Sequence, residues 1–143
     1  MFERFKMEQD YLSVFKNVGM GTTIWSPLAA GFLTGKYNNG IPESSRFGIH
    51  GFDWLKERWL QADKIEKAKK LSAIADELGV KLSALSIAWC IQNKNVTTAI
   101  LGATTKQQLA ENLEALNVLP LLNTEVNQKI ENILQNKPVL DLM

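Results

Sequence analysis

The sequence predicts an α/β fold in which two short parallel strands are connected through helices. Residues 21–26 (GTTIWS) and 96–101 (VTTAIL) have the length and the β-branched composition of strands. Two helical patterns lie between them, and strands joined through helices pair in parallel by right-handed crossovers. Parallel strands are normally covered on both faces within larger sheets. Two strands therefore indicate a part of a larger fold.

The first half of the chain is predicted to contain one helix, one strand and a long loop. Residues 7–18 place apolar side chains on one helical stripe, and Gly19 follows as a C-cap. After the strand at 21–26, residues 28–37 (LAAGFLTGKY) are apolar but carry two glycines, which favours a short helix or a turn. Residues 38–51 are rich in turn-forming residues and predict the loop.

Two helices are predicted before the second strand. Residues 61–78 repeat apolar residues at helical spacing and are followed by Gly79. Residues 83–93 (SALSIAWCIQN) begin with Ser83 as the expected N-cap and are apolar nearly all round. This second helix is therefore expected to be buried.

Two more helices are expected after the second strand. The first begins at Thr104 and Thr105, where Thr105 and Gln108 have the spacing of a capping box. Its apolar positions are Leu109, Leu113 and Leu116. The last helix is capped by Thr124 or Asn123 and continues through Leu134.

The length and composition fit one globular domain and exclude several other classes. The 143 residues are 45% hydrophobic and 22% charged, and about 137–143 are expected to form a loose tail. Sixteen Lys and Arg against 15 Asp and Glu leave a net charge of +1, which gives no electrostatic case for nucleic acid or an anionic membrane. Cys90 and His50 are single, which excludes an internal disulfide and a two-histidine zinc site.

No targeting or membrane-spanning segment is visible in the sequence. The first residues, MFERFKMEQD, carry early acidic residues and lack the apolar core of a signal peptide. No stretch reaches the ~20 apolar residues that a transmembrane helix needs. We therefore expect a cytoplasmic protein without membrane insertion.

The segment after the second strand has the chemistry of an anion site. In LGATTKQQLAEN, residues 101–112, a strand ends, a glycine permits a turn, and a helix begins with two hydroxyl groups. The first-turn amides of a helix lack internal acceptors and carry the positive end of the helix dipole, which suits a phosphate group. The same pattern also fits an ordinary threonine-capped helix, so the segment alone leaves both interpretations open.

The end of the first strand offers a second group of candidate ligands. Trp25 lies at the carboxyl end of that strand, where α/β folds place ligands, and its indole is suited to stacking on a flat ring. The alternative is a tryptophan of the core. Lys36 and Arg46 are cations on a loop rich in Gly, Pro and Ser, where they suit phosphate binding or simple exposure to solvent.

Four segments together resemble one known family. WSPLAAGFLTGKY, GIPESSR, IAWCIQN and LGATTKQQLAEN, in this order and spacing, are similar to the C-terminal part of aldo-keto reductases, and most of all to the branch with the β-subunits of voltage-gated potassium channels. The resemblance runs from about Met1 to about Pro138. It implies the C-terminal portion of a (β/α)8 TIM barrel that binds NADP(H) without a Rossmann domain. Residues 21–26 and 96–101 would be strands seven and eight, incomplete as an independent barrel.

The resemblance also implies which residues contact the cofactor. Trp25 matches the aromatic position that stacks on the nicotinamide, and Lys36 and Arg46 match basic residues around the phosphates and the adenosine end. The loop that passes the pyrophosphate matches Ser26, Pro27, Leu28 and Ala29. The turn that holds the 2′-phosphate ribose matches Gly102 and Thr104, and positions that face the adenosine match Gln108, Glu111 and Asn112. Residues 104, 108, 111 and 112 would share one helix face.

The resemblance implies no catalytic residue in this chain. The family's tetrad of Asp, Tyr, Lys and His lies in its N-terminal half, and the chain is expected to begin just after barrel strand six. Tyr11, Tyr37 and His50 do not match the tetrad positions. The chain alone is therefore expected to be inactive, whereas its full-length parent would transfer hydride between NADPH and a small aldehyde or ketone.

Three functional interpretations follow from the sequence. The first is a fragment of that oxidoreductase, whose partner is the missing N-terminal barrel half or another copy of the chain. The second is a non-catalytic module, similar to a channel subunit, that senses the cofactor or binds a partner. The third is a degenerate remnant that binds nothing.

Overall fold

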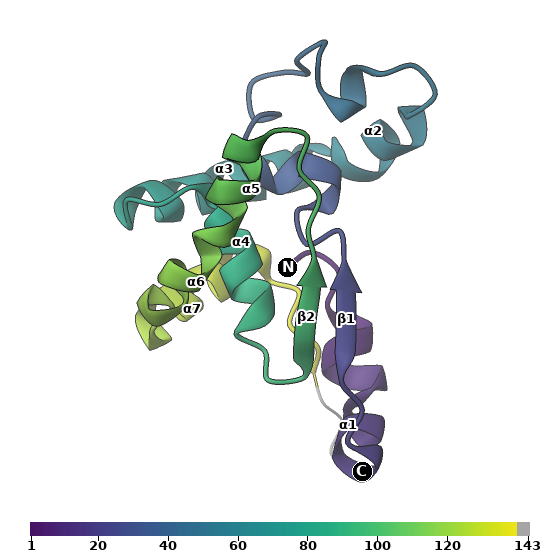
Figure 1. Ribbon diagram of the computed structural model, residues 1–143, viewed down its shortest axis with the longest axis vertical. Helices are drawn as coiled ribbons and strands as arrows, with labels where there is room; N and C mark the ends of the chain where they lie inside the picture. The colour runs from purple at the N-terminus through teal and green to yellow at the C-terminus, as the bar shows by residue number, and fades with distance from the viewer. Residues whose placement is uncertain (140–143) are drawn as a thin grey trace.

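The computed structural model describes residues 1–139 and confirms an α/β fold with few strands (Figure 1). Its first half contains a π-helical turn Lys6–Asp10, α1 (Leu12–Val18), β1 (Thr22–Trp25), a 3-10 segment Ala29–Thr34, a 3-10 turn Arg46–Gly48 and α2 (Asp53–Trp59). Its second half contains α3 (Ala62–Glu77), α4 (Leu82–Ile91), β2 (Val96–Ile100), α5 (Lys106–Leu113), α6 (Ala115–Val118), a 3-10 turn Leu119–Leu121 and α7 (Thr124–Leu134).

The two strands pair in parallel, as predicted. The register joins Thr23 to Thr98 and Trp25 to Ile100, and it is irregular between Thr22 and Thr23. The carboxyl ends of both strands therefore lie at the same end of the sheet (Figure 1). Along both strands, which the structure describes completely, every side chain is exposed or half-buried.

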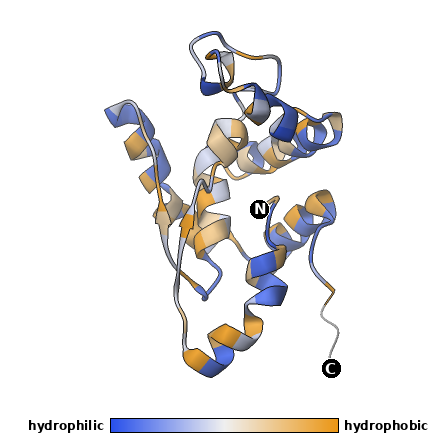
Figure 2. Ribbon diagram, turned by 90° about the vertical axis from the view of Figure 1, so that its right-hand side faces the viewer, coloured by the Kyte–Doolittle hydropathy of each residue, from blue (hydrophilic) through white to orange (hydrophobic). Residues whose placement is uncertain are grey.

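Helix α4 forms the centre of the core. All residues from Leu82 to Cys90 are buried, which confirms the expectation from their composition, and Figure 2 shows hydrophobic residues along this central helix. Lys81, not Ser83, is the N-cap residue, because the chain is extended at Lys81 and helical from Leu82 onward. Ser83 is instead buried within the first turn.

The N-terminal helix differs from its prediction. The expected helix 7–18 is divided at Tyr11 into a π-helical turn and α1, which ends at Gly19 in the left-handed conformation as predicted. Within the described chain, these two elements contain no buried residue, and Val18 is largely exposed. The apolar stripe of this segment is thus half-buried or exposed and forms no part of the core.

Helix α2 was not predicted. It follows the loop 38–51 and places Leu55 and Trp59, one helical turn apart, against the core. The ring of Trp59 is stacked on that of Phe32 at 5.9 Å, and Phe2 meets both rings edge-on. This aromatic cluster joins the N-terminal segment, the 3-10 segment after β1 and α2.

The helix expected after β2 is interrupted. A turn at Glu114 separates α5 from α6, and Pro120 lies in the 3-10 turn that follows. Thr105 caps α5 as predicted, because its Oγ1 accepts a hydrogen bond from the Gln108 amide at 3.1 Å. Asn123 caps α7, and its Oδ1 accepts from the Val126 amide at 2.9 Å.

The end of the chain has no regular structure after α7 as far as it is described. Residues 135–139 contain no helix or strand, and residues 140–143 of the expected tail lie outside the described residues. None of the helices found in residues 1–139 has both the length and the apolar character needed to cross a membrane.

Candidate functional site

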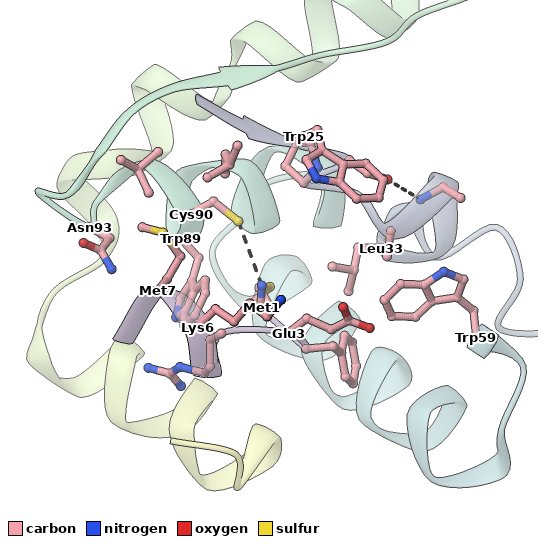
Figure 3. A pocket seen from close by; sticks show the side chains of 18 of the residues that line it. Met1, Glu3, Lys6, Met7, Trp25, Leu33, Trp59, Trp89, Cys90 and Asn93 are labelled. Atoms are coloured by element: carbon pink, nitrogen blue, oxygen red, sulfur yellow. Dashed lines mark hydrogen bonds between the residues drawn. The ribbon is translucent and has the colours of Figure 1, made fainter. Parts of the chain in front are cut away.

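A cavity of about 800 Å³ opens beside β1 (Figure 3). Its walls come from the N-terminal segment, β1 and the loop after it, α2 and α4. Figure 3 shows Trp25 at the strand side, with Trp59 and Trp89 on other walls. Five of the twelve residues proposed from the sequence line this cavity, namely Trp25, Ser26, Pro27, Ala29 and Arg46.

Trp25 presents its indole to solvent at the end of β1. Its side chain is 75% exposed, so Trp25 is not part of the core that residues 1–139 form. Because an exposed indole offers a flat apolar face, Trp25 is placed for stacking on a planar ring. Its register partner at the carboxyl end of β2, Ile100, is exposed as well.

The backbone after Trp25 turns sharply and is strained. Ser26, Ala29 and Ala30 all have positive φ, at 53°, 51° and 58°. A non-glycine residue in this region costs roughly 1–3 kcal/mol, and such residues cluster at functional sites. The Ser26 hydroxyl accepts a hydrogen bond from the Ala30 amide at 3.1 Å, and the Ser26 carbonyl accepts one from the Ala29 amide at 2.9 Å. These bonds hold the turn that lines the cavity.

Two buried aromatic rings connect the loops that carry Lys36 and Arg46. Tyr37 and Phe47 stack with centroids 4.1 Å apart and planes 10° apart, and the Phe47 amide donates to the Tyr37 hydroxyl at 3.4 Å. The Lys36 ammonium lies 5.2 Å from the centroid of the Tyr37 ring. Both cations are exposed, whereas the ring beside each one in sequence is buried. The stack thus fixes the two cation-bearing segments to each other.

Replacing Phe47 by alanine is expected to release the loop that carries Arg46. The change removes the stack on Tyr37 and leaves a cavity, at a cost of about 3–5 kcal/mol of unfolding free energy. Limited trypsin digestion checks the local effect, because cleavage after Arg46 should become much faster in Phe47→Ala than in the wild type.

Leu71→Ala serves as the control, since Leu71 is a fully buried residue of α3. It should lower stability to a similar degree without a selective increase of cleavage after Arg46. Equal cleavage patterns in the two variants would contradict the anchoring role of the stack.

The start of α5 forms a second group of candidate residues. Gln108 Oε1 accepts hydrogen bonds from the Thr104 amide at 2.9 Å and from the Thr104 hydroxyl at 3.0 Å. Together with the Thr105 cap, these bonds order the first turn. The amides of Lys106 and Gln107 have no acceptor within the helix, because they belong to its first turn. This end of α5 thus offers polar groups and a positive dipole to an anion.

The other predicted residues after β2 have different surroundings. Glu111 is half-buried and accepts a hydrogen bond from Gln107 Nε2 at 3.1 Å. Asn112 is buried, so it does not share the exposure of Thr104 and Gln108. Apart from its two chain neighbours, no described residue has an atom within 4 Å of the position that a Cβ on Gly102 would take.

The predicted residues thus fall into two groups at one end of the sheet. Seven of them do not line the cavity, namely Leu28, Lys36, Gly102, Thr104, Gln108, Glu111 and Asn112. The residues from Gly102 onward follow β2, whereas the cavity residues Trp25 to Ala29 follow β1. Parallel pairing brings these two turns to the same end.

Sequence reasoning missed an ion cluster in the wall of the cavity. The guanidinium of Arg4 pairs with Glu8 at 2.7 Å and Glu131 at 2.6 Å, and lies 4.8 Å from the centroid of the Trp89 ring. Burial lowers the pKa of Arg4, but hydrogen bonds to Glu131 and Glu8 outweigh it, so this pKa is raised. The i,i+4 spacing of Arg4 and Glu8 was a signal in the sequence, whereas the contact with Glu131 was not.

Comparisons with known proteins identify the family of this chain. The aldo/keto reductase family matches residues 2–135. Over 139 residues, 96% of the chain, the sequence is 50% identical to a protein of Arabidopsis thaliana described as a probable voltage-gated potassium channel subunit beta. A protein of Oryza sativa subsp. japonica with the same description is 48% identical over 139 residues, again 96% of the chain. The chain spans 42% of the length of each of these relatives. It belongs to the aldo/keto reductase family.

Proposed function

We propose that the chain is the NADP(H)-binding C-terminal portion of an aldo-keto reductase, with β1 and β2 as strands seven and eight of its barrel. Its full-length parent would transfer hydride between NADPH and a small aldehyde or ketone. One observation carries the proposal: five residues that match the family's cofactor contacts line a single cavity of about 800 Å³ at a strand end. The end of a barrel strand is where this fold binds ligands.

The chemistry of these residues fits a nicotinamide dinucleotide phosphate. The exposed indole of Trp25 suits the flat nicotinamide ring, and the turn from Ser26 to Ala29 would pass the pyrophosphate. Arg46 at the cavity and Lys36, both exposed, supply positive charge for phosphate groups. The start of α5 would hold the 2′-phosphate and the adenosine end. When bound, the cofactor supplies the hydride, while this chain binds and orients it.

The acid–base groups of the reaction would come from outside this chain. No residue here matches the family's catalytic tyrosine, lysine, aspartate or histidine, so we assign no catalytic residue. The remaining β/α units of the barrel would supply these groups together with most of the substrate pocket. The 42% coverage of the relatives supports this division.

A second candidate function is a non-catalytic module that senses NADP(H). The relatives described as probable voltage-gated potassium channel subunits beta favour it, because a channel subunit can use cofactor binding as a signal without turnover. Both candidate functions use the same cofactor site. They differ in whether the bound cofactor transfers hydride to a carbonyl compound. The test joins the chain to the part of a relative that lies outside the match. If the first candidate is right, the joined protein should reduce carbonyl substrates with NADPH. If the second is right, it should bind NADPH without reducing them.

Titration with NADPH, followed by tryptophan fluorescence, tests the cofactor site. We expect saturable quenching of the wild-type chain and loss of most of this quenching in Trp25→Phe, because stacking needs the Trp25 indole. Trp54→Phe is the matched control, since Trp54 is also exposed and also lines the cavity. Arg46→Ala should weaken binding about tenfold through loss of a charge-assisted contact.

If the folded chain shows no saturable quenching, or if Trp25→Phe and Trp54→Phe behave alike, Trp25 does not stack on the cofactor in this chain. The experiment would then be repeated with the unmatched barrel units joined to the chain.

A further inference from the structure

The turn after β1 brings the end of the Lys36 side chain against Gly31. A Cβ atom built on Gly31 would lie 3.1 Å from both Cε and Nζ of Lys36. This separation is shorter than the ordinary van der Waals contact of a Cβ atom, which begins at 3.4 Å. The ammonium group of Lys36 therefore occupies space that is free because Gly31 has no side chain.

The hydroxyl group of Thr34 connects the same two residues through their backbones. Thr34 Oγ1 donates a hydrogen bond to the Gly31 carbonyl at 2.8 Å and accepts a long one from the Lys36 amide at 3.5 Å. Gly35, which lies between Thr34 and Lys36, has a φ of 81° in the left-handed region that favours glycine. The chain thus folds back on itself between Gly31 and Lys36.

The ammonium group of Lys36 has an aromatic neighbour and no carboxylate partner. It lies over the ring of Tyr37, which is buried and stacked on Phe47. A cation in this position is attracted by the electrons of the ring face. No ion pair of Lys36 is found among residues 1–139. Its positive charge is therefore available to an anionic ligand.

This lysine lies against the turn that carries part of the cavity wall. Ala29 and Ala30, the two residues before Gly31, line the cavity. The Gly31 amide donates a hydrogen bond to the Leu28 carbonyl at 3.0 Å, so Gly31 belongs to the same turn. The ammonium group of Lys36 thus contacts the turn along which the pyrophosphate of the proposed cofactor would pass.

We propose that Gly31 and Thr34 are positioning residues, which hold the Lys36 ammonium against the turn after β1 as a preformed contact for a phosphate group. A lysine side chain that is held in place before binding loses less conformational freedom when it meets its ligand, which favours affinity. The identity of the phosphate ligand rests on the proposed cofactor function. The placement of Lys36 rests on the contacts described above.

The substitutions that test this inference must separate the placement of Lys36 from backbone strain. Gly31 has a φ of 93°, so Gly31→Ala strains the backbone and also displaces Lys36. Gly79→Ala is the matched control, because Gly79 has a φ of 68° and no atom within 4 Å of its Cβ position apart from its chain neighbours. Thr34→Val removes the hydroxyl group at nearly constant shape, and Thr34→Ser retains it. Thr34→Val therefore tests the inference even if Gly31→Ala fails to fold.

The position of Lys36 is measured by NMR on the 143-residue chain labelled with 13C at the Cε atoms of lysine. Lys36→Arg identifies the signal, which we expect to be shifted from those of freely exposed lysines by the Tyr37 ring. Gly31→Ala and Thr34→Val should move this signal to the position of exposed lysines. Gly79→Ala and Thr34→Ser should leave it unchanged. An unshifted signal in the wild type, or a signal that neither Gly31→Ala nor Thr34→Val moves, overturns the proposal.

Titration with NADPH, followed by tryptophan fluorescence, measures what the placement contributes to binding. Gly31→Ala and Thr34→Val should each raise Kd about fivefold, and the two control variants should change it less than about twofold. In a Lys36→Met background, Gly31→Ala and Thr34→Val should change Kd less than about twofold, because the residue that they position is absent. An undiminished effect in that background shows that they act independently of Lys36 and overturns the proposal.

The two measurements distinguish this inference from the proposed cofactor function. If the Lys36 signal responds as expected and the wild-type chain shows no saturable quenching by NADPH, the placement of Lys36 is supported and the cofactor function fails for this chain. If quenching is saturable and the Lys36 signal responds to neither Gly31→Ala nor Thr34→Val, the cofactor function is supported and this inference fails.

Discussion

Replacing Phe32 by alanine is expected to reduce the unfolding free energy of the chain by about 3–5 kcal/mol. Phe32 is 1% exposed, and its ring contacts Trp59 and Phe2 with both centroid distances at 5.9 Å. The substitution removes these contacts and leaves a cavity where the N-terminal segment, the segment after β1 and α2 meet. A cavity at this junction cannot collapse easily, because three separate segments form its walls.

Urea denaturation followed by circular dichroism measures this effect. Phe5→Ala is the matched control, since Phe5 is largely exposed and its loss should change the unfolding free energy by no more than about 0.5 kcal/mol. Phe32→Leu retains most of the volume and should fall between the two. If Phe32→Ala and Phe5→Ala have the same effect, the aromatic cluster does not hold these segments together.

The elements that sequence reasoning located share a strong local signal. β1 and β2 are β-branched runs, and glycine and Pro27 bound the first of them. Helix α4 was located by its apolar run although its N-cap was misassigned, and α7 combines an apolar pattern with the Asn123 cap, which was among the alternatives considered. Such signals lie within a few residues of each other, so one sequence is sufficient to find them.

The elements that were missed or misplaced depend on distant contacts. Helix α2 has only seven residues and is stabilised by Leu55 and Trp59 against the core, a contact that no local pattern reveals. The helical periodicity of α5 was recognised in the sequence. Periodicity alone does not show which face of the helix packs against the core. Leu109, Leu113 and Leu116 were the expected apolar positions and are exposed, whereas Asn112, Ala115 and Val118 are the buried positions of α5 and α6.

In the candidate site, too, some features have a local sequence signal and others depend on distant contacts. Strand ends and loop cations are visible in the sequence because their position in an α/β fold follows from general rules. The Tyr37–Phe47 stack joins residues ten positions apart, and the Arg4–Glu131 pair joins residues 127 positions apart. Only the folded chain shows that these contacts shape the walls of the cavity and position Arg46.

Arg4→Met is the second substitution with a large expected effect. Arg4 is 7% exposed and connects the N-terminal segment to α7 through Glu131, while its guanidinium lies over Trp89 of α4. Methionine retains much of the apolar stem but leaves Glu8 and Glu131 without their cation. Breaking a buried pair costs about 3–5 kcal/mol. Both carboxylates keep partial access to water, so we expect a loss of about 2–3 kcal/mol.

The control for Arg4 is an exposed pair of the same type. Arg58 contacts Glu3 on the surface, and Arg58→Met should change the unfolding free energy by less than about 1 kcal/mol. The raised pKa of Arg4 gives a stabilisation that is fully present below the ordinary pKa of arginine and is lost only above the raised value. Titration of Arg4 itself therefore adds no pH dependence near neutrality. If Arg4→Met unfolds at the same urea concentration as Arg58→Met, the Arg4 cluster does not fix the N-terminal segment to α7, and that wall of the cavity must be held by the aromatic cluster alone.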